Sequence, residues 1–281
     1  MGTIKREDIA NSNIHYRFYP FETFLEKQEE LGVRKIDLFG ATPHMWIDAY
    51  SASDAGEVRR QIEGRGMEVN SFTPEFSSMR YTLGAEGEGE RKTWEYVKRF
   101  LEFAAGLGTG RIILTANGFL LDRDEKEQRR RLKDSLRHLG ELGKPYGFQF
   151  LLLNSFSDGT SLIRTKADME GFLAELSSES FLPAVDTASV YEAGECLEDW
   201  FSSFGESLSH VSFNNTKFDG ARHYWGDGYL NPVEILEVLK HVGYGKSIGC
   251  SFYVRDYLKE PWLADERTGE IISWALGEVS V

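Results

Sequence analysis

Residues 151–162 read LLLNSFSDGTSL, and the three leucines complete a largely apolar run, 148–153, that stops at Asn154. A short apolar run bounded by polar residues is typical of a strand that is buried on both faces. A helical pattern follows at 166–176. Because such strands belong to parallel sheets, which need a crossover helix between neighbouring strands, this stretch predicts one β-α unit of an α/β fold.

The same unit recurs along the chain in strict alternation. Strand-like runs are predicted at 14–16, 35–39, 68–72, 111–116, 148–153, 182–186, 209–213 and 247–253. Helical patterns are predicted at 21–31, 54–65, 89–107, 126–146, 166–176, 194–204, 232–242 and 261–276. Left-handed C-caps are expected at the glycines that follow helices, Gly32, Gly66, Gly108, Gly147 and Gly243. Eight such units favour a closed (β/α)8 TIM barrel over an open sheet, with residues 1–281 as a single domain.

The composition narrows the choice of partners. The chain has 281 residues and a formal net charge of −13. This acidic excess argues against nucleic acid or an anionic membrane as a partner, since both attract clustered Lys and Arg. The N-terminal residues lack the apolar core of a signal peptide, and no apolar run approaches the ~20 residues of a membrane span. Cys196 and Cys250 lie far apart in sequence, so no disulfide framework is predicted and a cytoplasmic location is expected.

Polar and aromatic residues gather where the predicted strands end. In a barrel of this kind the active site lies at the carboxyl ends of the strands. Amide side chains such as Asn117 and Asn154 both donate and accept hydrogen bonds, and aromatic rings such as that of Trp46 stack on apolar faces. These groups suit a neutral polyhydroxy ligand. The sequence therefore predicts a small-molecule carbohydrate as the ligand.

Five segments, in order along the chain, resemble a known family. They are IDLFGATPHMW (36–46), FTPEFSSMRYTLG (72–84), VDTASVY (185–191), LSHVSFNNTKFDGARHYWGDG (208–228) and LKEP (258–261). Together they resemble the xylose-isomerase-like superfamily of sugar isomerases and epimerases, and they are most similar to the fructoselysine 3-epimerases. The resemblance implies a TIM barrel that acts on sugars, and it implies a homo-oligomer.

The resemblance also implies one divalent metal, often Mn²⁺, held by Glu, Asp, His and Glu from strands five to eight. The metal polarises the sugar carbonyl, and the two glutamates move protons on opposite faces of the sugar. On this chain those four positions fall on Asn154, Asp186, Ser212 and Ser251, so three of the ligands are replaced. A single carboxylate offers too little charge for tight binding of a hard cation. No cofactor is therefore expected, although weak binding of Mn²⁺ or Mg²⁺ stays open.

Two hypotheses for function follow. The first is an isomerase or epimerase that acts on a ketose or an amine-linked sugar adduct, either without metal or with a rebuilt site. In that case Asp186, Glu75 and His223 must carry the proton transfers, because Asn and Ser cannot cycle a proton near neutral pH. The second is a non-catalytic carbohydrate-binding barrel, a pseudoenzyme that serves as a subunit or regulator beside an active paralogue.

Either hypothesis needs residues that contact the sugar. The candidates are Asn154, His44, Asn117, Ser212, Ser251, Trp46, Lys217 and Arg255. Lys217 and Arg255 could bind a charged substituent such as a carboxylate or a phosphate. Two alternatives remain open for the catalytic candidates: Asp186 could be a strand-end carboxylate bonded to nearby groups, and His223 could fasten the long loop after the seventh strand.

Overall fold

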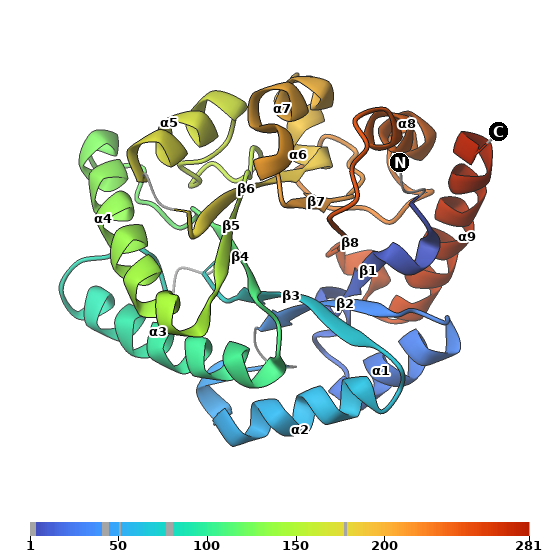
Figure 1. Cartoon of the computed structure of the whole chain (residues 1–281), viewed down its shortest axis with the longest axis horizontal. Helices are drawn as coiled ribbons and strands as arrows, with labels where there is room; N and C mark the ends of the chain where they lie inside the picture. Colours follow the sequence, from blue (N-terminus) through green and yellow to red (C-terminus); the bar gives the residue numbers. More distant parts are fainter. Residues whose placement is uncertain (1–3, 41–44, 51, 77–80, 177–178, 281) are drawn as a thin grey trace.

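The computed structural model describes residues 4–40, 45–50, 52–76, 81–176 and 179–280. Its parallel strands pair in sequence order from β1 to β8, and β1 pairs with β8 to close the barrel. Helices surround the strands on the outside, as Figure 1 shows. The prediction of a (β/α)8 barrel is therefore confirmed.

The elements have the following bounds. The strands are β1 (Ile9–Ser12), β2 (Lys35–Gly40), β3 (Glu68–Pro74), β4 (Arg111–Thr115), β5 (Gln149–Leu153), β6 (Phe181–Asp186), β7 (His210–Ser212) and β8 (Ser247–Cys250). The α-helices are α1 (Phe21–Glu30), α2 (Ala52–Glu63), α3 (Gly87–Leu107), α4 (Glu125–Gly143), α5 (Lys166–Leu176), α6 (Thr187–Glu192), α7 (Leu197–Phe204), α8 (Pro232–His241) and α9 (Pro261–Ser280). Within the described residues, 3₁₀ turns follow three of the strands, namely η2 (Ile14–Tyr16), η3 (Ile47–Ala49) and η6 (Arg255–Tyr257). None of the helices in the described ranges is long and apolar enough to cross a membrane.

The first strand was predicted in the wrong place. Residues 14–16 form the turn η2, and β1 lies upstream with the sequence IANS. Half of this strand is polar, and Asn11 is buried in a hydrogen-bonded network that includes Gln28 Oε1, at 2.8 Å from Asn11 Nδ2. Because polar partners satisfy this strand, it lacks the apolar pattern on which the prediction depended.

Glycines end the helices as predicted. The five C-cap candidates have φ values between 68° and 78°, in the left-handed region that glycine adopts without strain. One helix was missed: α6 follows β6 directly, and its first turn is capped by the side chain of Asp186. This cap is the first sign that Asp186 has a structural role.

The interior of the barrel is divided between apolar and polar sides. Ile113, Leu151 and Ala184 pack together on β4, β5 and β6. Asp37 on β2 and His210 on β7 are also buried, at 8% and 1% exposed. The larger apolar core lies between the strands and the surrounding helices. The interior therefore combines an apolar group on β4, β5 and β6 with buried polar side chains on β2 and β7.

Candidate functional site

A cavity of about 470 Å³ lies at the carboxyl ends of the strands. Each of the eight strands contributes a lining residue, namely Ser12, Phe39, Thr73, Thr115, Leu153, Asp186, Ser212 and Cys250. The volume is in the range of small-molecule sites. Asn154 and Ser251, which follow β5 and β8, line it as well. The fold thus brings together all four positions at which the sequence resemblance expects metal ligands.

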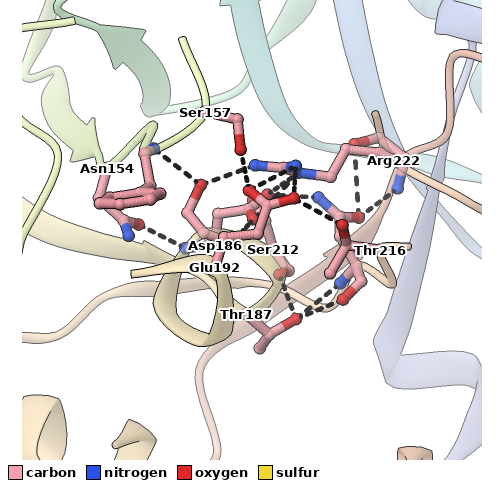
Figure 2. Close-up of polar contacts among 12 residues, drawn as sticks. Asn154, Ser157, Asp186, Thr187, Glu192, Ser212, Thr216 and Arg222 are labelled. Atoms are coloured by element: carbon pink, nitrogen blue, oxygen red, sulfur yellow. Dashed lines mark hydrogen bonds and ion pairs between the residues drawn. The ribbon is translucent and has the colours of Figure 1, made fainter. Parts of the chain in front are cut away.

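Asp186 has both carboxylate oxygens engaged. It ends β6 and is 4% exposed. Its Oδ1 accepts a hydrogen bond from the backbone N–H of Ser189 at 2.8 Å, and its Oδ2 accepts one from Asn214 Nδ2 at 2.6 Å. Arg222 Nε lies 3.1 Å from Oδ1 and 3.2 Å from Oδ2, as the contacts in Figure 2 show. The carboxylate is therefore held by a helix cap, an amide and a guanidinium.

Arg222 is a buried cation with two carboxylate partners. Its Nη1 lies 3.4 Å from Glu192 Oε2, and its Nη2 donates to Ser189 Oγ at 2.6 Å. Burial alone would lower the pKa of Arg222, but the negative charges of Asp186 and Glu192 outweigh burial and raise the pKa above its ordinary value. The guanidinium therefore stays charged beside Asp186 at every physiological pH.

The amides at the ends of β5 and β4 offer hydrogen-bonding atoms to the cavity. Asn154 Oδ1 accepts from the backbone N–H of Asp186 at 2.7 Å, which fixes the orientation of the amide. Asn154 is 1% exposed, and its Nδ2 has no hydrogen-bond partner among the described residues. Asn117 Oδ1 is likewise buried without such a partner. Buried polar atoms are nearly always paired, so these two atoms are candidates for ligand contacts.

This donor set does not fit the divalent metal that the family resemblance implies. The two oxygens of Asp186 already accept hydrogen bonds, and Asn154 presents an NH₂ group because its oxygen is taken. The guanidinium of Arg222 places a positive charge where a cation would have to approach. Across the part of the chain that the structure describes, no three His, Cys, Asp or Glu side chains are grouped to hold a metal ion. Hard cations require several charged or oxygen ligands, and the site supplies hydrogen-bond donors instead.

A carboxylate that the sequence analysis missed lies deeper in the cavity. Asp37 Oδ1 accepts hydrogen bonds from Asn70 Nδ2 and Ser71 Oγ, both at 2.6 Å. Gly249 leaves room for this side chain, because a Cβ atom at that position would lie 1.6 Å from Asp37 Oδ2. A charged residue inside the apolar run of β2 was the signal that could have revealed it.

His210 links the same polar region to the mouth. Its Nδ1 lies 2.8 Å from Ser247 Oγ, and its Nε2 lies 3.1 Å from Ser212 Oγ. Burial lowers the pKa of His210 below its ordinary value, although the nearby charge of Asp37 opposes this shift. His210 is therefore neutral at pH 7.

Cys250 also lines the cavity, and its side chain is a buried thiol. Burial raises the pKa of this thiol to about 12, and the thiol donates to the backbone oxygen of Phe213 at 2.8 Å. The thiol therefore stays protonated at neutral pH and is a poor nucleophile.

His223 and Lys217 lie in the loop after β7, outside the set of described residues that line the cavity. His223 is 4% exposed, with Nε2 at 2.9 Å from Asp219 Oδ2 and Nδ1 at 3.2 Å from Asp227 Oδ2. Lys217 Nζ lies 2.7 Å from Asp227 Oδ1. These contacts tie the loop to itself, in keeping with the alternative in which His223 fastens the loop.

The remaining predicted residues divide between the cavity and its surroundings. Asn117 lines the cavity, whereas Glu75, Trp46 and Arg255 are not among its described lining residues. His44 lies outside the residues that the structure describes. Three further residues line the cavity and were not predicted from the sequence, namely Arg17, Asp37 and Arg222.

Comparison with known proteins identifies a family and several solved structures that this chain resembles. A family model, the xylose isomerase-like TIM barrel, matches residues 25–274. Similar solved structures include a 3-keto-D-glucoside 4-epimerase from E. coli, with a TM-score of 0.74 and 18% identity over 95% of this chain and 98% of that one. Another is a D-psicose 3-epimerase from Clostridium cellulolyticum H10 with D-tagatose, with a TM-score of 0.78 and 18% identity over 95% of this chain and 98% of that one.

A third is a xylose isomerase-like TIM barrel protein from Mycobacterium smegmatis in complex with magnesium, with a TM-score of 0.68 and 17% identity over 96% of this chain and 97% of that one. No significant match is found among curated proteins. At these identities the structural likeness shows the fold alone, and the similarity to fructoselysine 3-epimerases stays a prediction. The family model covers most of the sequence, and the chain therefore belongs to the xylose isomerase-like TIM barrel family.

Proposed function

We propose that this protein binds a ketose or an amine-linked sugar adduct at the mouth of its barrel, without the metal-dependent proton transfer that its family resemblance implies. The observation that carries this proposal is the ion pair between Arg222 and Asp186. It engages the one carboxylate that remains at the four expected ligand positions. A carboxylate held by a guanidinium and two further donors is a poor metal ligand and a poor base.

The rest of the lining supports a carbohydrate ligand. Asn117, Asn154, Ser212 and Ser251 offer neutral donors and acceptors around a cavity of about 470 Å³. Such groups can hydrogen-bond to sugar hydroxyls. A ligand that pairs with the unpaired buried amide atoms gains binding free energy, because those atoms otherwise stay desolvated without a partner. Two structurally similar proteins, a 3-keto-D-glucoside 4-epimerase and a D-psicose 3-epimerase, agree with this ligand class.

Binding without metal can be tested on the chelator-treated protein. We expect D-fructose, D-psicose, D-tagatose or fructosyl-lysine to bind in calorimetric titrations with an affinity that Mn²⁺ does not change. Asn154→Ala should weaken that binding roughly tenfold, the effect of about 1.4 kcal/mol for one lost hydrogen bond. Gln61→Ala, which removes a surface amide on α2, serves as the matched control. Sugar binding that appears only with one equivalent of Mn²⁺ would overturn the proposal.

One observation favours a second candidate, a metal-independent enzyme of the same sugar class. Asp37 lines the cavity, and its Oδ2 accepts no hydrogen bond from any residue in the described ranges. A carboxylate with one free oxygen could remove a proton from the carbon beside a sugar carbonyl. This candidate predicts that deuterium from solvent enters the bound ketose and that Asp37→Asn abolishes the exchange. Binding without exchange in the unchanged protein rejects it and leaves the binding proposal intact.

A further inference from the structure

Arg17 presents an uncompensated positive charge to the cavity. It follows the turn η2 and lines the cavity together with Ser12 and Ile14. Its guanidinium makes no hydrogen bond or ion pair with a described residue, and its Nε is buried without a partner. Its carbon Cζ lies 5.2 Å from the centre of the Phe18 ring, which is an attractive contact but not a neutralising one.

The other cations near the mouth are neutralised or lie elsewhere. Arg222 has the carboxylates of Asp186 and Glu192 as partners. Lys217 is paired with Asp227, and Arg255 is an exposed residue outside the cavity lining. Arg17 is therefore the described lining residue that offers a positive charge without a protein counter-ion. Because a guanidinium binds carboxylate and phosphate groups through paired hydrogen bonds, this lining position suits an anionic ligand.

A chain of hydrogen bonds orients a second donor, Ser212, toward the cavity. Arg111 Nη1 can only donate, and it lies 3.1 Å from Asn70 Oδ1, so the Asn70 amide must point its Nδ2 at Asp37 and Ser247. Ser247 Oγ accepts this hydrogen bond and lies 2.8 Å from the Nδ1 atom of His210, to which it can donate its own hydrogen.

The tautomer of His210 then determines what Ser212 can do. When the ring carries its proton on Nε2, that proton is donated to Ser212 Oγ at 3.1 Å. In that tautomer the Ser212 hydroxyl hydrogen is left for a ligand atom. Asn154 Nδ2 is a third donor, since its oxygen is committed to the backbone of Asp186. All three donors require electron-rich oxygens on the ligand.

We propose that the ligand is an anionic sugar derivative, whose carboxylate or phosphate group pairs with Arg17 while Asn154 and Ser212 donate to its oxygens. This proposal rests on the proposed function, carbohydrate binding at the barrel mouth. It moves the role of binding a charged substituent from Lys217 and Arg255, where the sequence suggested it, to Arg17. Carboxylate and phosphate share the chemistry that an arginine fork recognises.

The test compares ligands that share a ketose skeleton and differ in charge. D-Fructose, D-fructose 6-phosphate and 5-keto-D-gluconate are titrated separately into the full chain, with inorganic phosphate as the control for simple anion binding. We expect the phosphate or the carboxylate ligand to bind at least tenfold more tightly than D-fructose and than inorganic phosphate. The preference should shrink as salt concentration rises. Which of the two anionic ligands binds more tightly distinguishes a sugar phosphate from a sugar acid.

Variants of two arginines make the test specific. Arg17→Gln should abolish the preference for the anionic ligand and leave D-fructose binding within threefold, whereas Arg255→Gln should change neither. Because Arg17 makes no polar contact with the described protein, its variant should keep the melting temperature of the unchanged chain. Equal binding of charged and neutral ligands, or an equal loss in both variants, would overturn this inference and leave the proposed function standing. If none of the sugars binds, both proposals fail.

Discussion

The guanidinium of Arg222 and the carboxylate of Asp186 form an ion pair at the mouth of the barrel, with Nε 3.1 Å from Oδ1 and side chains that are 5% and 6% exposed. The carboxylate comes from the end of β6, and the guanidinium comes from the loop after β7. A fixed organic cation thus lies beside the carboxylate that the resemblance assigns to a divalent metal. The arrangement places a positive charge in the site, and both oxygens of the Asp186 carboxylate accept hydrogen bonds from the protein.

Removal of this cation should destabilise the protein. Arg222→Met leaves Asp186 and Glu192 buried without their counter-ion, and a broken buried pair typically costs about 3–5 kcal/mol. Urea unfolding should therefore show a much lower midpoint for this variant. Arg130→Met, which removes an exposed arginine paired with Glu127 on α4, should leave the midpoint nearly unchanged. Equal midpoints for the two variants would contradict the importance assigned to the buried pair.

Metal ligands alone should not restore a metal site. A triple variant with Asn154→Glu, Ser212→His and Ser251→Glu rebuilds the expected ligand set but keeps the guanidinium next to Asp186. We expect it to bind Mn²⁺ weakly, and we expect Arg222→Ala in the same background to improve affinity by at least tenfold, because like charges no longer compete for the carboxylate. Calorimetric titration measures both affinities, and circular dichroism checks that both variants fold. Tight binding by the triple variant would show that Arg222 does not exclude the metal.

Gly249 should be required for the position of Asp37. Gly249→Ala places a methyl group in contact with the Asp37 carboxylate, so the free energy of unfolding should fall by at least about 1–3 kcal/mol. A double variant that combines Gly249→Ala with Asp37→Ala lacks the carboxylate, so it should recover much of the lost unfolding free energy. Gly171→Ala on α5 meets nothing within 4 Å and should be neutral or stabilising by about 0.5–1 kcal/mol. Chemical denaturation of the unchanged protein and the three variants checks this pattern, and a failure of the second substitution to recover stability would contradict it.

Stability should fall with acid in a way that depends on His210. The pKa of His210 is lowered by burial in the folded protein, so the unfolded chain takes up the proton first. The stabilising effect of the neutral ring is therefore complete above the unfolded-state pKa of about 6.5 and is lost as the pH falls below that value, with a slope of at most about 1.4 kcal/mol per pH unit.

His210→Gln keeps a donor for Ser212 but removes this titration. The groups that act electrostatically on His210 are Asp37, Arg111 and Asp186, and all three are retained in the variant. Between pH 7.5 and 5.5 the unchanged protein should lose more unfolding free energy than the variant does. Parallel pH dependences in the two proteins would show that the His210 ring does not resist protonation.

The barrel could be predicted well because the spacing of apolar residues along each strand and helix depends on which side of that element is buried. The run at 148–153 and the helix at 166–176 describe β5 and α5 almost to the residue. The first strand was missed because Asn11 is buried and hydrogen-bonds to Gln28 and Asp265, which are distant in sequence, so the strand has no apolar pattern. Where a strand is stabilised by long-range polar contacts, a local pattern cannot reveal it.

The site was only partly predictable for the same reason. Strand ends identified Asn154, Asp186 and Ser212, since strand order alone brings them to one mouth. Arg222 reaches Asp186 through a loop that folds back on itself, with a β-bridge between Asn215 and His223. The spacing of residues in the sequence does not predict that this loop brings Arg222 back to Asp186.

Binding of Mn²⁺ to the chelator-treated wild-type protein shows whether the site holds a metal, and it can be followed by the electron paramagnetic resonance signal of free Mn²⁺. The pair between Arg222 and Asp186 predicts that an equimolar amount of protein leaves the free-ion signal unchanged. Loss of the signal at one equivalent of protein, with a stoichiometric site, would contradict the proposal that this protein binds its ligand without a metal.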